Sequence, residues 1–210
     1  MSNVLILFAH PSQTRSEVNL PLFNCSHIQG VTCVDLYSEY PNFRINIEKE
    51  QQRLLEHDVV VFMFPMYWYS TPAILKEWQD LVLEHGFAYG HNGKQLHGKK
   101  FMCALSAGGP EAAYQSEGMN HYAIHELLQP LQQMASLCGM QYVAPYVLFS
   151  ARTATEDNTI KKHVTQWQEV LNAMVNDQFD HNSASQLSLL NPNQSIDANL
   201  INFTPAGDSK

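Results

Sequence analysis

The chain has 210 residues, of which 45% are hydrophobic and 15% charged, a length and composition that favour one well-packed globular domain over a disordered chain. Acidic residues outnumber basic ones by 20 to 12, and the net charge of −8 would repel a phosphate backbone, so we expect no nucleic-acid partner. No apolar run approaches the roughly 20 residues of a membrane span.

Five short, mostly continuous apolar runs predict buried strands at residues 4–9, 31–36, 59–64, 101–105 and 141–149. Helical patterns lie between or after them, at 16–28, 47–56, 72–84, 124–137 and 155–175. Pro130 should kink or break the fourth of these helices.

Strands that alternate with helices imply a parallel sheet covered on both faces. We therefore predict an α/β fold, a flavodoxin-like three-layer sandwich with a five-stranded parallel sheet in the order 2-1-3-4-5. The rival nucleotide-binding sheet needs a GxGxxG motif after its first strand, which is absent here, and no GKS or GKT of a phosphate loop occurs. The domain should span residues 1–176.

Residues 177–210 are rich in Asn and Ser and lack periodicity, which predicts a poorly ordered or loosely docked tail. Its apolar patches, Leu187-Leu189-Leu190 and Leu200-Ile201-Phe203, are the exception and could dock on the domain or on a partner.

The four cysteines form no CxxC pair and are interpreted as reduced thiols of a cytoplasmic protein. The first residues carry no basic segment before the apolar run, so we expect no secretory signal. The ten histidines show no zinc-binding spacing, and no metal site is predicted.

Three loops at predicted strand ends are candidates for ligand binding, because open parallel sheets bind ligands beyond the carboxyl ends of their strands. After the first strand, Ser16 and Asn19 at a helix start could hold an anion, with positive charge from His10 and Arg15; a plain helix cap is an equal alternative. After the third strand, the consecutive aromatic residues Tyr67, Trp68 and Tyr69 suit a flat heterocycle such as a flavin, although they could instead cap the sheet or contact a subunit.

The third loop contains Gly108-Gly109, which would let backbone approach a ligand but also fits an ordinary turn. Tyr114 and His121 follow it as single residues whose interest comes only from their position.

Four motifs occur in the order of one known family: AHPxxxxSxxN, FPMYWYSTPAILKEWQD, HGFAYG and LHGKKFMCALSAGG. Over residues 3–175 the chain resembles the flavodoxin-like NAD(P)H:quinone oxidoreductases, of which DT-diaphorase is the best-known animal member. It is most similar to the bacterial ancillary subunits of glutathione-gated potassium efflux systems, which are themselves quinone reductases.

The resemblance implies a noncovalent flavin that takes hydride from NADH or NADPH and passes two electrons to a quinone by a ping-pong mechanism. It also implies three groups of flavin-binding residues: a phosphate loop of His10, Ser16, Glu17, Val18 and Asn19; a loop along the isoalloxazine of Pro65, Met66, Tyr67, Trp68, Tyr69 and Ser70; and a third loop of Ala107, Gly108, Gly109 and Pro110.

Tyr114 falls where the animal enzymes place a catalytic tyrosine. Their catalytic histidine falls nearest Asn120, one residue before His121, and we predict Tyr114 and His121 as the catalytic residues. Such groups would stabilise charge on the reduced flavin. The potassium-efflux members use FMN and the animal members FAD, and the short domain favours FMN.

Members of the family are typically homodimers with the site at the interface, so the resemblance implies a homodimer here. A second reading is a regulatory subunit that docks on a membrane potassium-efflux transporter at the inner face of the membrane, with redox activity secondary. A third is a flavodoxin-like electron carrier, which would stabilise a one-electron state of the flavin.

Overall fold

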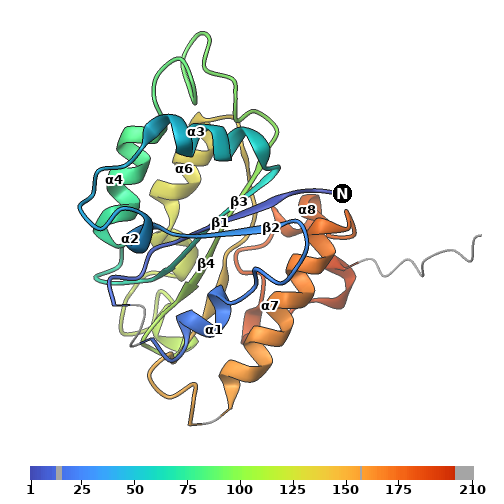
Figure 1. Cartoon of the computed structure of the whole chain (residues 1–210). Helices are drawn as coiled ribbons and strands as arrows, with labels where there is room; N and C mark the ends of the chain where they lie inside the picture. The colour runs from blue at the N-terminus through green and yellow to red at the C-terminus, as the bar shows by residue number, and fades with distance from the viewer. Residues whose placement is uncertain (13–15, 157, 202–210) are drawn as a thin grey trace, which may run out of the picture.

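The computed structural model describes residues 1–12, 16–156 and 158–201. Within these residues one parallel sheet has the order β2-β1-β3-β4-β5, and β6 also pairs with β4 (Figure 1). The predicted flavodoxin-like fold and strand order are therefore confirmed. The strands are β1 (Val4–Phe8), β2 (Val31–Asp35), β3 (Val59–Pro65), β4 (Lys100–Ser106), β5 (Gln141–Tyr142) and β6 (Tyr146–Leu148).

The predicted last strand, 141–149, is divided into β5 and β6. Val143 still donates from its backbone N–H to the carbonyl of Phe101, at 2.8 Å. The N–H of Ala144 instead donates to the carbonyl of Ala184, at 3.3 Å, and Pro145 has no N–H to offer to the sheet. The interruption therefore follows from the proline together with a competing backbone partner.

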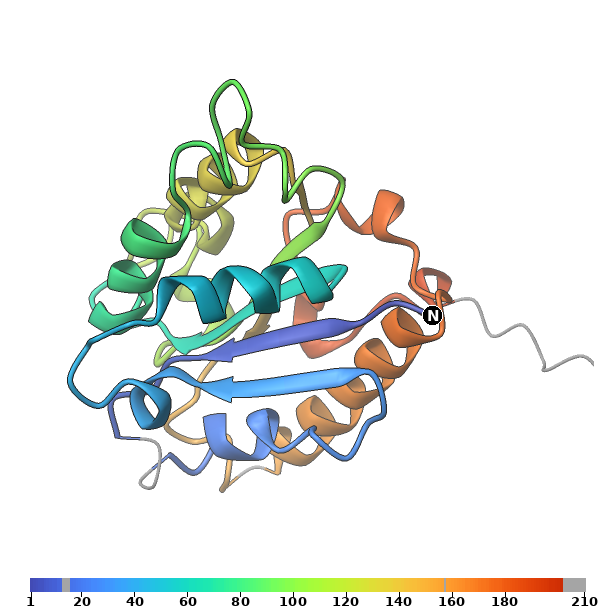
Figure 2. The ribbon, with the colours of Figure 1, turned by 45° about the horizontal axis from the view of Figure 1, so that its top comes forward.

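Helices cover both faces of the sheet (Figures 1 and 2). Alternate residues of β1 belong to different core clusters: Leu5 and Leu7 to one, Val4 and Ile6 to the other, and all four are buried. This two-sided burial explains the continuous apolar runs. The first face carries α2 (Leu36–Glu39), α3 (Ile47–Glu56), α4 (Ala73–Val82), α5 (Ile124–Leu127) and α6 (Gln129–Leu137), and the second carries α1 (Asn19–Phe23), α7 (Thr159–Val175) and α8 (His181–Ala184).

The predicted helix 47–56 is confirmed as α3, and the predicted break in 124–137 separates α5 from α6, with Pro130 in the first turn of α6. Three predicted helices were too long, and of these the predicted 72–84 is shorter only at its ends, as α4. α1 covers only Asn19–Phe23 because the chain turns after Asn24, and α7 starts at Thr159 because Asn158 adopts a left-handed conformation, with φ of 60°.

A buried carboxylate joins three elements of the first face. Glu50 of α3 is fully buried and accepts hydrogen bonds from Tyr40 Oη at 2.6 Å and from Trp78 Nε1 of α4 at 2.9 Å. It also forms an ion pair with Arg53. A buried charge is tolerated when it is paired and hydrogen-bonded, as it is here, so Glu50 fixes α3 and α4 relative to the end of α2.

Residues 178–201 pack on the sheet edge and the second core cluster, as in the docked alternative stated for the tail. Asn191 is fully buried, and its side chain acts as a substitute strand: Oδ1 accepts from the N–H of Val147 and Nδ2 donates to its carbonyl, both at 2.9 Å. Leu190, Leu200 and Ile201 are also buried. Phe203 lies outside the described residues.

Replacing Asn191 with Ala should lower the free energy of unfolding by about 2–4 kcal/mol, because two buried backbone groups of β6 lose their partner. The measurement is urea unfolding followed by circular dichroism. Asn199, an exposed asparagine of the same segment, is the control, and its replacement by Ala should cost under about 1 kcal/mol. Equal effects of the two substitutions would contradict the assigned role of Asn191.

His163 of α7 makes stability depend on pH. Its ring is 2% exposed and stacks on Tyr146, and neither ring nitrogen has a hydrogen-bond partner among the described residues. Burial lowers its pKa to about 3, whereas the unfolded ring titrates at 6.5. Between these values the unfolded chain binds the extra proton, so stability falls as pH falls from 6.5 towards 3.

Replacing His163 with Phe, which keeps the stacked ring, should flatten this slope by up to about 1.4 kcal/mol per pH unit. Urea unfolding at several pH values between 4 and 8 measures the difference between the two chains. A variant with an unchanged slope would show that His163 is not the group that titrates.

Candidate active site

A cavity of about 890 Å³ lies at the carboxyl ends of β1, β3 and β4, a size typical of small-molecule sites. It is lined by residues of four loops and one helix start: His10, Ser12, Ser16, Glu17, Val18, Asn19, Pro65, Met66, Tyr67, Trp68, Tyr69, Ser106, Gly108, Gly109, Tyr114, Met119, Asn120, Ala151 and Arg152. The predicted loops after the first, third and fourth strands therefore meet at one place.

His10 follows β1 and is buried at the cavity wall. Its Nδ1 accepts a hydrogen bond from the N–H of Ser12, at 3.1 Å, so in the neutral ring the proton is on Nε2, which lies 3.5 Å from Tyr67 Oη. Burial lowers the pKa of His10, and the nearby charge of Asp35 only opposes that shift. The suggestion that His10 supplies positive charge is therefore not supported, and Arg15 lies outside the described residues.

A chain of three polar side chains connects the first loop to β4. Ser16 Oγ accepts from both the backbone N–H and Nδ2 of Asn19, at 2.9 and 3.1 Å, and Ser106 Oγ donates to Asn19 Oδ1 at 3.0 Å. Asn19 is 3% exposed, so its amide is fixed between the two serines. Ser16 thus accepts from the first residue of α1 without being its N-cap, which is Val18, and it also lines the cavity.

The aromatic loop after β3 has an unusual backbone. Trp68 and Tyr69 both have positive φ, 50° and 63°, which costs non-glycine residues about 1–3 kcal/mol each. Ser70 closes the turn by donating its N–H to the carbonyl of Tyr67, at 3.1 Å. Trp68 is 93% exposed, so packing within this chain does not explain the strain. Strain of this kind concentrates at ligand sites.

The third loop is tied to the end of β6. Ala107 donates its N–H to the carbonyl of Leu148, at 2.8 Å, and accepts from the N–H of Ala151 at 3.0 Å. A Cβ built on Gly108 would lie 3.5 Å from Arg152 Nε, so the guanidinium lies beside the glycine pair. Pro110 precedes the short turn η2 (Glu111–Ala113), which leads to Tyr114.

Tyr114 lines the cavity, as predicted for a catalytic residue, and is 7% exposed. Burial raises the pKa of its hydroxyl, which therefore stays protonated at neutral pH and is able to donate a hydrogen bond. His121 does not line the cavity, whereas its neighbour Asn120 does, and Asn120 Oδ1 accepts from Tyr69 Oη at 3.0 Å. The geometry therefore offers Asn120 in the position predicted for His121.

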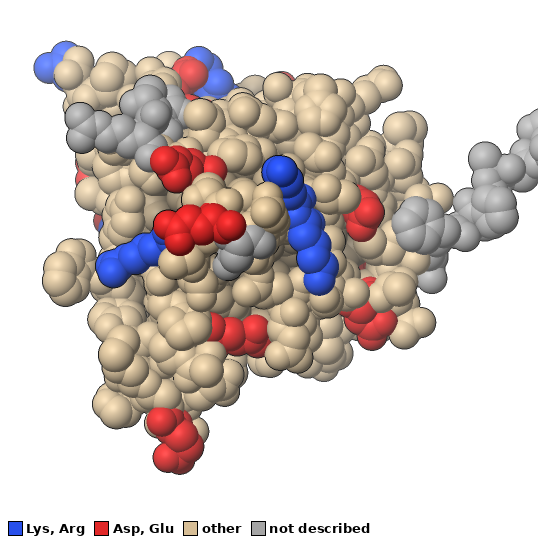
Figure 3. Space-filling model, turned by 90° about the horizontal axis from the view of Figure 1, so that it is seen from below, with Lys and Arg blue, Asp and Glu red and all other residues tan. Residues whose placement is uncertain are grey.

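Four predicted residues lie outside the cavity lining: Ser70, Ala107, Pro110 and His121. Sequence reasoning missed Ser12, Ser106, Met119, Asn120, Ala151 and Arg152. The signal for Arg152 was available, because it follows the last strand and the strand ends of a parallel sheet share one edge. Among the Lys, Arg, Asp and Glu residues that the structure describes, only Glu17 and Arg152 are in the lining. On the face shown in Figure 3, charges of both signs lie among uncharged residues.

Residues 2–171 match a protein family described by its flavodoxin-like fold, and the chain belongs to that family. The glutathione-regulated potassium-efflux system ancillary protein KefG of Cronobacter sakazakii is 45% identical over 152 residues, which are 72% of this chain and 83% of that protein. General stress protein 14 of Treponema denticola, solved in complex with FMN, is 31% identical with a TM-score of 0.76, over 83% of this chain and 98% of that one.

An NADPH-quinone reductase of P. pentosaceus is also 31% identical, with a TM-score of 0.71, over 80% of this chain and 96% of that one. In the described part of the chain, no helix is both long and apolar enough to cross a membrane. Nor do the described residues include a cluster of three or more His, Cys, Asp or Glu side chains that could hold a metal ion.

The strain at Trp68 makes a stability prediction. The free energy of unfolding of the Trp68→Gly variant should be about 1 kcal/mol greater than that of the Trp68→Ala variant, because glycine adopts a positive φ without steric cost. Urea unfolding measures both values. Glu77, an exposed residue of α4, is the control: there the glycine variant should be about 1 kcal/mol less stable than the alanine variant. If the alanine variant were the more stable one at both positions, the strained turn at Trp68 would be contradicted.

Proposed function

We propose that the protein is an FMN-dependent NAD(P)H:quinone oxidoreductase. The observation that carries this proposal is the cavity at the strand ends, where a strained, exposed aromatic loop and a glycine pair line the same space. The relatives named above as an FMN complex and as an NADPH-quinone reductase support it. FAD is the less favoured alternative, since general stress protein 14 of Treponema denticola was solved in complex with FMN.

The residues present fit a flavin. Gly108 and Gly109 have room for a Cβ at ordinary contact distances of 3.5 Å, so packing within the chain does not require glycine there. A side chain at these positions would instead take up space beside the cavity they line. Met66, Tyr67 and Trp68 would lie along the flat ring, because aromatic and sulfur-containing side chains suit its polarisable faces.

The phosphate of the cofactor would lie against the first loop. A hydroxyl donates one proton in addition to the bonds it accepts, so Ser16, fixed by Asn19, would donate to a phosphate oxygen. Ser12 lies on the same wall. Arg152 would supply the positive charge that neutral His10 does not.

Bound flavin would supply the redox chemistry, accepting hydride from NADPH or NADH and passing two electrons to a quinone. Tyr114, held as a neutral phenol, would donate a hydrogen bond to oxygen atoms that gain charge during transfer. Asn120, oriented by Tyr69, would position the incoming substrate. We propose a ping-pong mechanism, in which nicotinamide and quinone occupy the same open cavity in turn.

The direct test is to release the flavin from purified protein, identify it by chromatography, and assay menadione reduction with NADPH and with NADH. The proposal predicts a yellow protein that releases FMN and turns over with at least one of the two nucleotides. Protein reconstituted with FMN and FAD that reduces no quinone with either nucleotide would overturn the enzyme proposal.

Ser16→Ala should weaken FMN binding by about 1 kcal/mol, or roughly fivefold in Kd, through loss of one hydrogen bond to phosphate.

Trp68→Ala should weaken FMN binding more than it lowers the free energy of unfolding, because its side chain is 93% exposed without the cofactor. FMN fluorescence titration measures the Kd of each variant, and urea unfolding measures the free energy of unfolding of Trp68→Ala. Ser188→Ala, at an exposed serine outside the cavity lining, is the control. If neither variant changed the affinity for FMN, the loops after β1 and β3 would not bind the cofactor as proposed.

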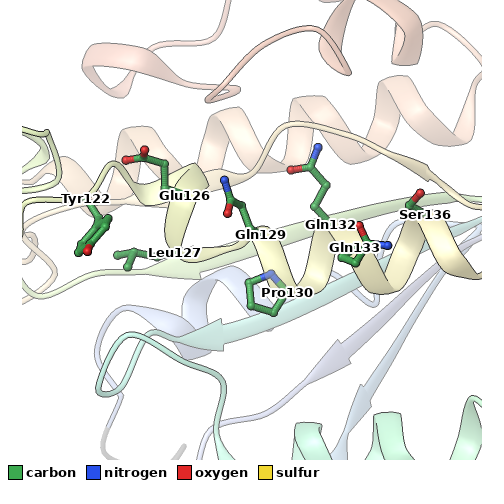
Figure 4. Close-up of a pocket in the computed structure, with 8 residues that line it drawn as sticks. All are labelled: Tyr122, Glu126, Leu127, Gln129, Pro130, Gln132, Gln133 and Ser136. Carbon is green, nitrogen blue, oxygen red and sulfur yellow. The ribbon is translucent and has the colours of Figure 1, made fainter.

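We also infer a homodimer, with the partner seated on a groove of about 810 Å³ along α5 and α6 (Figure 4). The groove includes Tyr122, which is 59% exposed and lies two residues from Asn120 of the cavity. A second copy at this place would cover the exposed aromatic residues and complete the site.

Tyr122→Asp should shift the protein from dimer to monomer in sedimentation velocity, because a charge would be buried at the contact. Leu137 is equally exposed at 59% but lies outside the groove lining, so Leu137→Asp is the matched control and should leave the dimer intact. A dimer that survives Tyr122→Asp would place the contact elsewhere.

A second candidate function is that of an ancillary subunit docked at the inner face of the membrane on a potassium-efflux transporter. The observation that favours it is the 45% identity to KefG. Deleting the gene should then alter potassium efflux under electrophile stress, and flavin-loop variants should restore normal efflux if redox activity is secondary. Efflux unaffected by the deletion would exclude this function.

A further inference from the structure

Two cysteines lie in contact at the edge of the sheet, outside the candidate active site. Cys25 follows α1 by two residues, and Cys33 lies in the edge strand β2. Their Sγ atoms are 3.4 Å apart, at hydrogen-bond distance. A disulfide needs about 2.0 Å, so small side-chain rotations would bring the two sulfurs to bonding distance.

The two thiols differ in access and in acidity. Cys25 is fully buried, whereas Cys33 is partly exposed. The contact between the two sulfurs lowers the pKa of Cys33, and the same contact, together with burial, raises the pKa of Cys25, whose Sγ also lies 3.3 Å from the carbonyl oxygen of Phe23. The thiolate therefore forms more readily on Cys33, the less buried of the two residues, with the thiol of Cys25 beside it. This is the arrangement of a peroxide-sensitive cysteine and its resolving partner.

We propose that Cys25 and Cys33 are a reversible dithiol–disulfide pair that is oxidised by peroxides. The Cys33 thiolate attacks one peroxide oxygen: an S–O bond forms, the O–O bond breaks, and the leaving oxygen departs as hydroxide, which takes up a proton. The Cys33 sulfur is oxidised by two electrons and the peroxide is reduced.

Cys25 then attacks the sulfur of Cys33. The S–S bond forms, the S–O bond breaks, and the oxygen leaves with the Cys25 proton as water. Two thiols and one hydrogen peroxide thus give one disulfide and two waters, and an added dithiol reverses the change.

The other two cysteines do not share this environment. Cys103 is fully buried in β4, and burial raises its pKa. Cys138 is 2% exposed, and burial raises its pKa to about 11. The bond between Cys25 and Cys33 would tie the end of α1, which carries Asn19 of the cavity, to β2. The proposal stands on this geometry and is independent of the proposed quinone reductase activity.

The test exposes the full-length protein to a small excess of hydrogen peroxide, blocks remaining thiols under denaturing conditions, and maps the peptides by mass spectrometry. The expected result is a Cys25–Cys33 link within one chain, lighter by two hydrogen atoms, that disappears after dithiothreitol. The thiols of Cys103 and Cys138 should remain free. No such link, or a link only between chains, would overturn the proposal.

Three variants test the order of events. Cys33→Ser should slow peroxide-dependent thiol loss at least about tenfold relative to the control Cys138→Ser, because it removes the only partly exposed thiol of the pair. Cys25→Ser should leave Cys33 as a sulfenic acid that dimedone traps. Equal rates in Cys33→Ser and Cys138→Ser, with both chains folded by circular dichroism, would contradict the assignment of Cys33 as the attacking thiol.

Discussion

The site depends on one constraint, the parallel direction of the strands. Because β1, β3, β4 and β6 all point the same way, their following loops emerge at one edge of the sheet, and residues separated by more than a hundred positions share a cavity. His10 and Arg152 illustrate this, as they come from opposite ends of the domain and line the same space. Two-sided burial of the sheet keeps the strand ends fixed in position.

The strands and their order were largely predictable, because strands buried on both faces have continuous apolar sequences. Prolines mark the ends of two of them: Pro11 follows β1, and Pro65 is the last residue of β3. The end of pairing after Val143 and the place where the tail docks were not predictable, since each depends on a long-range backbone partner: Ala144 with Ala184, and Asn191 with Val147. An asparagine in a polar, aperiodic segment is typical of a loop. Its pairing with the open edge of β6 can be recognised only in the folded structure.

Site residues divide in the same way. The aromatic loop was visible because three consecutive aromatic residues cannot all join one core face. The spacing of the resemblance pointed to Asn120, but His121 was chosen because its residue type matches the family's catalytic histidine. The cavity is lined by Asn120 and not by His121, which has a left-handed backbone with φ of 60°. The neutral state of His10 likewise required knowledge of its burial. Chemistry at the site is thus set by the surroundings of each side chain as much as by its type.

The central claim is that a flat flavin lies in the cavity between the aromatic loop and the glycine pair. A crystal structure of the protein grown with FMN tests it most directly. The account predicts the isoalloxazine beside Trp68 and Gly108, with the phosphate within hydrogen-bond distance of Ser16. Density for the cofactor elsewhere, or an empty cavity at saturating FMN, would contradict it.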